Sequence, residues 1–324
     1  MSFDIITIGD SVSDLFIKPH EVDSFRNKFN GTEICFPHGS KISVDEFYRS
    51  VGGSACNVAV GLSRLGYKSA IVGALGADGE AEKIRNKLAE ENVDTANLKN
   101  YAGASTNFSV IIVYKNDRTV LIHRGLKDYS KIKIPKNIKT KWFYLGPVAN
   151  SFEPNYKEII RLASEKNVNL AINPGHRQIT EGREALKRLI YVSKVLIVNK
   201  EEAIDLAKTG NFSNIKELLK RLKSFGAEVV VITDGENGAY LAFEDSFYGV
   251  KKHETEVVDA TGAGDAFSTG FLASIFGDNS PVESLKWGIM CASEVITSYG
   301  AETKLPNLEK LKKLAKIAPD VYTL

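Results

Sequence analysis

A loop of small residues followed directly by a carboxylate carries the strongest chemical signal in the sequence. Gly262, Ala263 and Gly264 form the loop. Apolar residues after Gly264 recur at helical spacing, which predicts a helix there. Small side chains let backbone N–H groups approach an anion, and the positive end of a helix favours negative charge. We interpret the loop as a phosphate cradle and Asp265 as a candidate general base for a hydroxyl group. Glycines before a helix also fit an ordinary turn. Asp265 would then only cap the helix or interact favourably with its dipole.

Polar residues also follow apolar runs elsewhere in the second half of the sequence. The segments 173–176, 199–202 and 233–238 each come directly after such a run. Carboxyl ends of parallel strands lie at one edge of a sheet, so these segments are expected to converge with the 262–264 loop on a nucleotide site. Taken singly, they also fit turns and first-turn helix carboxylates.

The first half offers two candidate contacts for a polar substrate. The apolar run 5–8 predicts a buried strand that opens at Asp10, and Asp14 stands close behind it. An Asx-type turn is an equally good explanation of these carboxylates. Further along, Ser54 is a candidate cap for a helix that ends near Gly66 and has Asn57 in its first turn.

The elements that must position these residues are those of an α/β fold. Strand candidates alternate with helical stretches, which favours a mostly parallel sheet with helices on both faces. Residues 19–50 and 105–123 instead suggest short strands and a hairpin. We expect a single domain over residues 1–324, with a small β lid inserted from about 11–50 and 103–124. The strand candidates lie at 5–8, 34–36, 41–44, 70–76, 107–114, 119–122, 142–145, 169–172, 195–198 and 229–232, and a helix is expected at 81–91.

Composition excludes several classes of function. The 324 residues include 42 basic and 40 acidic side chains, a net charge of +2. A net charge this small does not indicate binding to nucleic acid or to an anionic membrane. Three cysteines without a CxxC pair argue against a disulfide framework or a zinc site. The sequence shows no leader-like segment and no apolar run of membrane-spanning length, so we expect a cytoplasmic protein.

Three segments together resemble one enzyme family. The string DATGAGDAF at 259–267 closely resembles the C-terminal signature of the ribokinase-like, or PfkB, carbohydrate kinases. GGSACN at 52–57 is similar to the family's N-terminal Gly-Gly-x-x-x-Asn motif, and NKEE at 199–202 is similar to its Asn-x-x-Glu motif. The resemblance extends from Gly9 to Pro306 and implies a ribokinase-like fold.

The resemblance implies an ATP-dependent kinase that transfers the γ-phosphate to a primary hydroxyl of a small sugar. It assigns Asp265 as general base and Gly262, Ala263 and Gly264 as anion hole; Asp10, Asp14, Gly52, Gly53 and Asn57 to the sugar; and Asn199, Glu202, Thr233, Gly235 and Gly238 to ATP. Arg124, at the end of the second β-rich stretch, is a further candidate substrate contact, with a solvated surface arginine as the alternative.

The same resemblance implies binding sites for two cations. Glu202 is expected to act on Mg²⁺ through water, since magnesium prefers oxygen ligands and retains waters. Some family members bind potassium through a residue equivalent to Asp259 and a late segment equivalent to 298–301. Lys304 stands near that segment, where its ammonium group is expected to replace or repel the ion, so the potassium site stays open.

Two alternative functions remain at this point. A nucleoside kinase uses the same fold with other pocket contacts. A non-catalytic sugar or nucleotide sensor is expected to have lost Asp265 or the small-residue loop, and neither is lost here. The β lid also offers a strand edge that can pair with a second copy, which predicts a homodimer through the lids.

Overall fold

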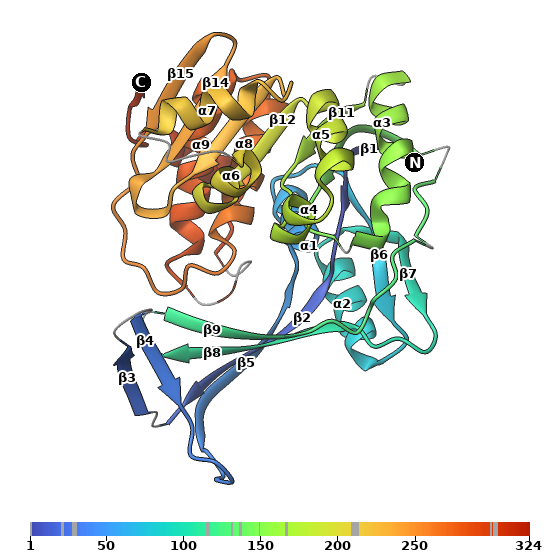
Figure 1. Cartoon of the computed structure of the whole chain (residues 1–324), viewed down its shortest axis with the longest axis vertical. Coiled ribbons are helices and arrows are strands. Elements are labelled where there is room, and N and C mark those ends of the chain that lie inside the picture. Colours follow the sequence, from blue (N-terminus) through green and yellow to red (C-terminus); the bar gives the residue numbers. More distant parts are fainter. Residues whose placement is uncertain are drawn as a thin grey trace.

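The computed structural model contains two principal sheets, joined where the N-terminal strands leave the body of the molecule (Figure 1). The structure describes residues 2–20, 23–27, 31–114, 117–130, 132–135, 138–148, 150–165, 168–208, 214–298, 300 and 304–324.

The larger sheet is mostly parallel, as the alternating pattern predicts. Within the described residues its strand order is β16-β15-β14-β13-β12-β11-β10-β1-β6-β7, and only the pairs among β13 to β16 are antiparallel. Continuous runs of apolar residues build its centre because both faces are covered. Its strands are β1 Ser2–Ile8, β6 Ser69–Gly76, β7 Asp94–Tyr101, β10 Lys139–Leu145, β11 Asn169–Ile172, β12 Val195–Asn199, β13 Val229–Thr233, β14 Ala239–Phe243, β15 Ser246–Val250 and β16 Val321–Thr323.

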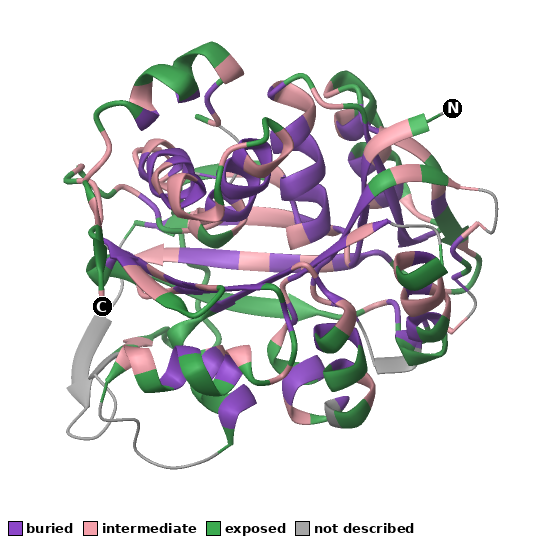
Figure 2. Cartoon of the chain, turned by 90° about the horizontal axis from the view of Figure 1, so that it is seen from above, coloured by how far each residue is buried: buried purple, intermediate pink, exposed green. Residues whose placement is uncertain are grey.

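Helices cover both faces of this sheet. Successive residues of a strand point to opposite faces. Ile6 therefore belongs to the apolar core on the side of α3 to α7, and Ile5 belongs to the core on the side of α1, α8, α9 and α10. Seen from above, buried strands run between helices whose outer surfaces are exposed (Figure 2). The helices are α1 Ser54–Arg64, α2 Gly79–Glu90, α3 Tyr156–Glu165, α4 His176–Thr180, α5 Arg183–Val192, α6 Lys200–Ala207, α7 Ile215–Lys223, α8 Ala263–Phe276, α9 Pro281–Val295 and α10 Leu308–Ala315, with 3₁₀ turns η1 Asn150–Asn155 and η2 Gly235–Asn237.

The smaller sheet joins the two β-rich stretches of the sequence. Its order is β5-β2-β8-β9, with β2 parallel to β8, so segments far apart in the chain pair as expected. It extends away from the body, next to the hairpin formed by β3 and β4 (Figure 1). The strands are β2 Val12–Pro19, β5 Val44–Gly52, β8 Asn107–Tyr114 and β9 Asp117–His123, with β3 Asp23–Asn27 and β4 Gly31–Cys35.

One strand expectation in this region is wrong. The run 41–44 was expected to be a strand, but β5 begins only at Val44 and continues to Gly52. Strand pairing sets the start of β5, because β5 pairs with β2 only from Val44 onward. The hairpin turn residues Lys115 and Asn116 lie outside the described residues.

Two expectations from composition can be compared with the structure. Cys35, Cys56 and Cys291 are all free thiols. Among the helices of the described residues, none has both the length and the apolar character needed to cross a bilayer.

Candidate active site

The small-residue loop forms the N-terminus of helix α8, as predicted. The helix begins at Ala263, two residues before the predicted start, and Gly262 is its N-cap with φ of +78°. That left-handed conformation favours glycine. The first N–H groups of a helix have no acceptor within it, and the space beside Gly264 is open. An anion placed here therefore meets backbone donors and the positive end of the helix.

Asp265, in the first turn of α8, is held by two donors from helix α1. Ser54 Oγ donates to Asp265 Oδ1 at 2.5 Å, and Asn57 Nδ2 donates to Asp265 Oδ2 at 2.7 Å. Burial raises the pKa of Asp265, while these two hydrogen bonds act in the opposite direction. The donors favour the ionised carboxylate and fix its orientation.

The expected role of Ser54 is wrong. Gly53, not Ser54, is the N-cap of α1, and no side chain caps the helix. Ser54 has helical geometry, and its hydroxyl contacts Asp265 and, at 2.8 Å, the Tyr144 hydroxyl on β10. The sequence analysis missed Tyr144 because it stands in an apolar run that indicates only a buried strand.

Asp10 lies just beyond β1, near Arg124 and Tyr129 from the segment after β9 and Arg177 from α4. Burial raises its pKa to about 6, against the effects of a hydrogen bond from Tyr129 and the charges of Arg124 and Arg177. Arg124 Nη1 is 4.0 Å from Asp10 Oδ2, and nearly half of its side chain is exposed. The sequence pattern did not predict Arg177, on α4, as a site residue. Its position directly after the polar segment that follows β11 is the one feature that could have indicated it.

Asp14 lies on β2 and is half-buried. Burial raises its pKa to about 6, although a hydrogen bond from Ser109 on β8 opposes the shift. A Cβ on Gly52 would stand 1.9 Å from Asp14 Oδ2, and one on Gly53 would stand 2.3 Å from the Asp10 carbonyl oxygen. The glycine pair therefore permits the backbone to pass close to both aspartates.

Two oxygens in this region stand out because they lack donors. Asp10 Oδ1 and Asn57 Oδ1 are buried, and neither has a hydrogen-bond partner among the described residues. Leaving a buried acceptor unsatisfied costs about 1–3 kcal/mol. Both therefore suit the hydroxyl groups of a polar ligand.

Asn199 and Glu202 build the start of α6 through a reciprocal capping box. Asn199 Oδ1 accepts from the Glu202 N–H at 2.8 Å, and Glu202 Oε2 accepts from the Asn199 N–H at 3.0 Å. Burial raises the pKa of Glu202, and the charges of Asp265 and Glu201 raise it further. Asp265 and Glu202 thus repel each other across the site.

The residues present fit a magnesium ion held mainly through water. Magnesium is usually bound by one or two carboxylates together with waters and substrate phosphates. A carboxylate that is partly desolvated and repelled by Asp265 gains from a neighbouring cation. In the part of the chain that the structure describes, no cluster of three or more acidic, histidine or cysteine ligands occurs.

Thr233 ends β13 directly beside Asn199, its register partner on β12. Gly235, with φ of +49°, lies in open space in the following turn. Gly238 has φ of +91°, and a Cβ there would stand 2.0 Å from the Val250 carbonyl oxygen. Asp234, between these residues, accepts from Lys200 Nζ at 2.8 Å, which ties the turn to α6.

Asp259 connects the loop to a later segment. Its Oδ1 accepts from Thr261 N and Oγ1 at 2.9 and 2.6 Å, and its Oδ2 accepts from Gly300 N at 3.1 Å. Lys304 Nζ donates to the Thr297 carbonyl oxygen at 3.1 Å. Tyr299 and Ala301 of the predicted potassium site lie outside the described residues, so that site stays a prediction.

Comparisons with known proteins agree on one family. The family model described as pfkB family carbohydrate kinase matches residues 22–308. An ATP-dependent 6-phosphofructokinase from Thermoanaerobacterium thermosaccharolyticum is 25% identical over 96% of this chain and 94% of its own length. A fructokinase from Salmonella typhimurium is 27% identical over 81% of this chain and 91% of its own.

Solved structures show the same fold. A nucleoside kinase from Methanocaldococcus jannaschii, described as an archaeal member of the ribokinase family, has a TM-score of 0.78 at 21% identity, covering 98% of this chain and 99% of that one. An Arabidopsis thaliana ribokinase, solved with ribose and ATP, has a TM-score of 0.79 at 19% identity with the same coverage. The predicted ribokinase-like fold is therefore confirmed.

Proposed function

The chain belongs to the pfkB family of carbohydrate kinases and is an ATP-dependent kinase; from this premise we propose that it phosphorylates a primary hydroxyl of a small sugar. The observation that supports this most directly is the pair of buried acceptors without donors, Asp10 Oδ1 and Asn57 Oδ1. Asn57 also contacts Asp265, so a ligand hydroxyl on Asn57 is close to the proposed base.

The proposed reaction begins when the sugar hydroxyl loses its proton to Asp265. The raised pKa of Asp265 makes this residue a better proton acceptor than an ordinary aspartate, and Ser54 and Asn57 keep its carboxylate in place. The oxygen of the hydroxyl then attacks the terminal phosphorus of ATP, and the bond to the leaving ADP breaks.

The N–H groups of the Gly262–Gly264 loop are proposed to face the transferred phosphoryl group. Charge in this transition state is spread over the equatorial oxygens, so backbone donors that are already in position lower its energy. Magnesium, when bound, neutralises phosphate charge. We propose that Glu202 and the neighbouring Asn199 bind its water shell.

The test of this function is ADP release from ATP and magnesium across pentoses, hexoses, phosphosugars and nucleosides. One compound class is expected to respond, and Asp265→Asn is expected to lower kcat by about 10²–10⁴-fold while nucleotide affinity stays unchanged. Asp278→Asn, in the exposed turn after α8, is the matched control. Unchanged turnover in the Asp265 variant would overturn the assignment of the base.

The same panel separates the alternatives. A response confined to nucleosides identifies a nucleoside kinase. The fold similarity to the Methanocaldococcus jannaschii nucleoside kinase does not favour this outcome, because one fold serves both substrate classes. ATP binding without ADP release for any compound favours a sensor.

We also propose that the smaller sheet acts as a lid and as the contact between two copies. Its edge strands carry exposed apolar side chains, and exposed apolar groups on strand edges mark association sites. These side chains are Val44 and Phe47 on β5, and Val120, Leu121 and Ile122 on β9.

A further inference from the structure

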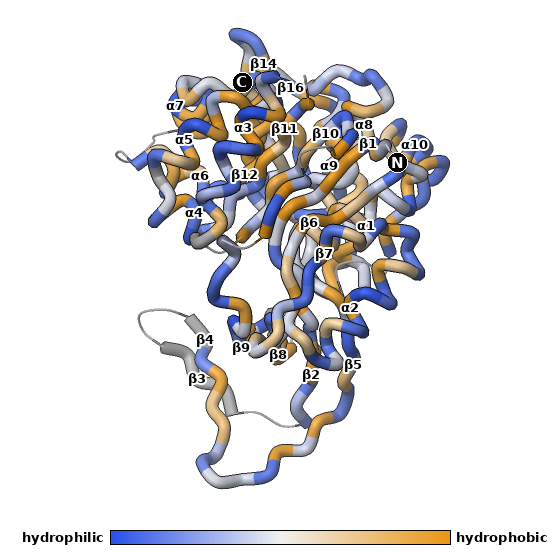
Figure 3. Tube along the Cα trace, turned by 90° about the vertical axis from the view of Figure 1, so that its right-hand side faces the viewer, coloured by the Kyte–Doolittle hydropathy of each residue, from blue (hydrophilic) through white to orange (hydrophobic). Residues whose placement is uncertain are grey.

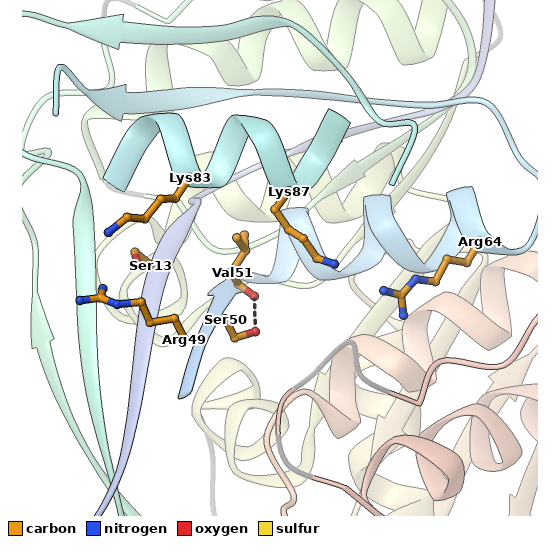
Figure 4. A pocket seen from close by; sticks show the side chains of 7 residues that line it. All are labelled: Ser13, Arg49, Ser50, Val51, Arg64, Lys83 and Lys87. Atoms are coloured by element: carbon orange, nitrogen blue, oxygen red, sulfur yellow. Dashed lines mark hydrogen bonds between the residues drawn. The ribbon is translucent and has the colours of Figure 1, made fainter. Parts of the chain in front are cut away.

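A cavity on the other side of β2 from the substrate residues is lined mainly by cations. Its volume is about 570 Å³, and Arg49 on β5, Arg64 on α1 and Lys83 and Lys87 on α2 line it. Figure 4 shows these four side chains around the cavity, together with Ser13, Ser50 and Val51. Such a volume is typical of sites for small molecules.

Carboxylates balance only part of this positive charge. Glu91 pairs with Arg64 at 2.6 Å and with Lys87 at 2.7 Å. Glu80 pairs with Lys83 at 2.6 Å and lies 3.4 Å from Arg49. Among the described residues, these four ion pairs join four cations to two carboxylates. The cations in these pairs therefore exceed the carboxylates by two charges.

Both carboxylates respond to their cationic neighbours. Hydrogen bonds from Arg64, against the effect of burial, lower the pKa of Glu91 to about 2, and Lys87 contributes. Burial alone would raise the pKa of Glu80, but hydrogen bonds from Lys83 and Ser13 lower it. Both groups therefore stay ionised at neutral pH.

The cavity is separate from the substrate site. Neighbouring residues of a strand point to opposite faces, so Ser13 and Asp14 on β2 face different sides. Ser13 donates to Glu80 on α2, whereas Asp14 contacts Ser109 and lies against Gly52. Val51 lines the cavity, whereas Gly52 lies against Asp14, and this segment leads through Gly53 into α1.

We propose that this cavity is a second binding site, for a phosphorylated small molecule. Arginine presents a planar fork of donors that matches phosphate oxygens, and lysine adds a mobile point charge. A phosphate dianion would match the excess positive charge. Because its ligands come from β5, α1 and α2, the bound phosphate joins the smaller sheet to the body at the segment that leads to Ser54 and Asn57.

The test is calorimetric titration of the full-length protein with inorganic phosphate and, separately, with fructose 1,6-bisphosphate. Lys83→Gln/Lys87→Gln removes two cations from α2, of which Lys83 is exposed and Lys87 is half-buried. Lys312→Gln/Lys313→Gln removes two exposed lysines from α10 as the control. Loss of two charged contacts is expected to weaken binding at least about tenfold in the first variant only.

The two titrants distinguish the sources of the phosphate. Equal affinities identify free phosphate as the ligand, and tighter binding of the bisphosphate identifies a phosphorylated sugar. Equal binding by all three proteins overturns the proposal, because the anion then binds elsewhere, as at the Gly262 loop. Failure of the wild-type protein to bind either titrant overturns it as well. Unchanged unfolding temperatures confirm that both variants fold.

Discussion

At the scale of single residues, the site is built around a carboxylate whose position depends on two neighbours. Ser54 and Asn57 both donate to Asp265, and both come from the first turn of α1. A carboxylate that is fixed in this way needs little reorganisation when it accepts a proton. The neighbours therefore belong to the catalytic arrangement even though neither changes its own protonation.

Removing the Asn57 amide should lower turnover without removing the base. Asn57→Ala loses a charge-assisted hydrogen bond, worth about 1.5–3 kcal/mol, so kcat should fall roughly ten- to a hundredfold. The loss of the acceptor Asn57 Oδ1 should also raise KM for the sugar. Steady-state kinetics with Asn100→Ala, an exposed asparagine on β7, as control checks both effects. Wild-type kcat in the Asn57 variant would contradict this arrangement.

Asp14 should destabilise the protein at neutral pH. Folding raises its pKa from 3.8 to about 6, so the native protein binds more protons than the unfolded chain between these values. Its contribution to the free energy of unfolding therefore falls as pH rises through this window. Asp14→Asn should stabilise the protein by roughly 1–3 kcal/mol at pH values above the window and much less below it.

Urea denaturation above and below the window measures this effect, with Asp320→Asn at the exposed C-terminal region as control. The same Asp14 variant should bind sugar more weakly. A stability difference that does not depend on pH would show that charge burial at Asp14 is not its cause.

At the scale of elements, close packing of α1 against α8 sets the distance between the donors and Asp265. A Cβ on Gly61 would stand 2.6 Å from Thr269 Cγ2, so the absence of a side chain lets the two helices approach. Gly61→Ala should therefore push α1 away from α8. We expect a loss of about 1–3 kcal/mol in stability and a fall in kcat.

Gly79→Ala is the matched control, because a Cβ there meets no atom within 4 Å. Thermal unfolding and kcat measured on both variants check the prediction. If the two variants behave alike, the spacing of α1 and α8 does not depend on Gly61.

Local sequence patterns predicted the elements that follow local rules. Apolar runs predicted a helix after Gly264 and six strands of the main sheet, and the structure contains them; these strands are β1, β6, β10, β11, β12 and β13. No strand was predicted for β7, β14, β15 or β16. Ser13 and Asp14 suggest a turn as readily as a substrate contact, yet both lie within strand β2, which forms through its pairing with β5 and β8. The contacts of Ser54 with Tyr144 and Asp265 span 90 and 211 residues of sequence, and no local pattern predicts such contacts.

At the scale of the whole molecule, the smaller sheet stands away from the body and exposes apolar groups along its edges. Figure 3 shows apolar segments in this projecting part, below the main sheet and its helices. Phe47 on β5 is 71% exposed, and Leu121 on β9 is 55% exposed. Side chains of this kind gain about 25 cal/mol for each Å² that a partner removes from water.

A second copy of the chain is the partner that we predict for these strands. Wild-type protein should show twice the mass of one chain in light scattering, and Leu121→Glu should shift it to the mass of one chain, since an interface disfavours a buried unpaired charge. Tyr191→Glu is the control, because Tyr191 on α5 is 73% exposed but lies on the body rather than on the smaller sheet. A wild-type mass equal to one chain would refute the dimer. A dimer that persists in the Leu121 variant but dissociates in the Tyr191 variant would place the interface on the body instead.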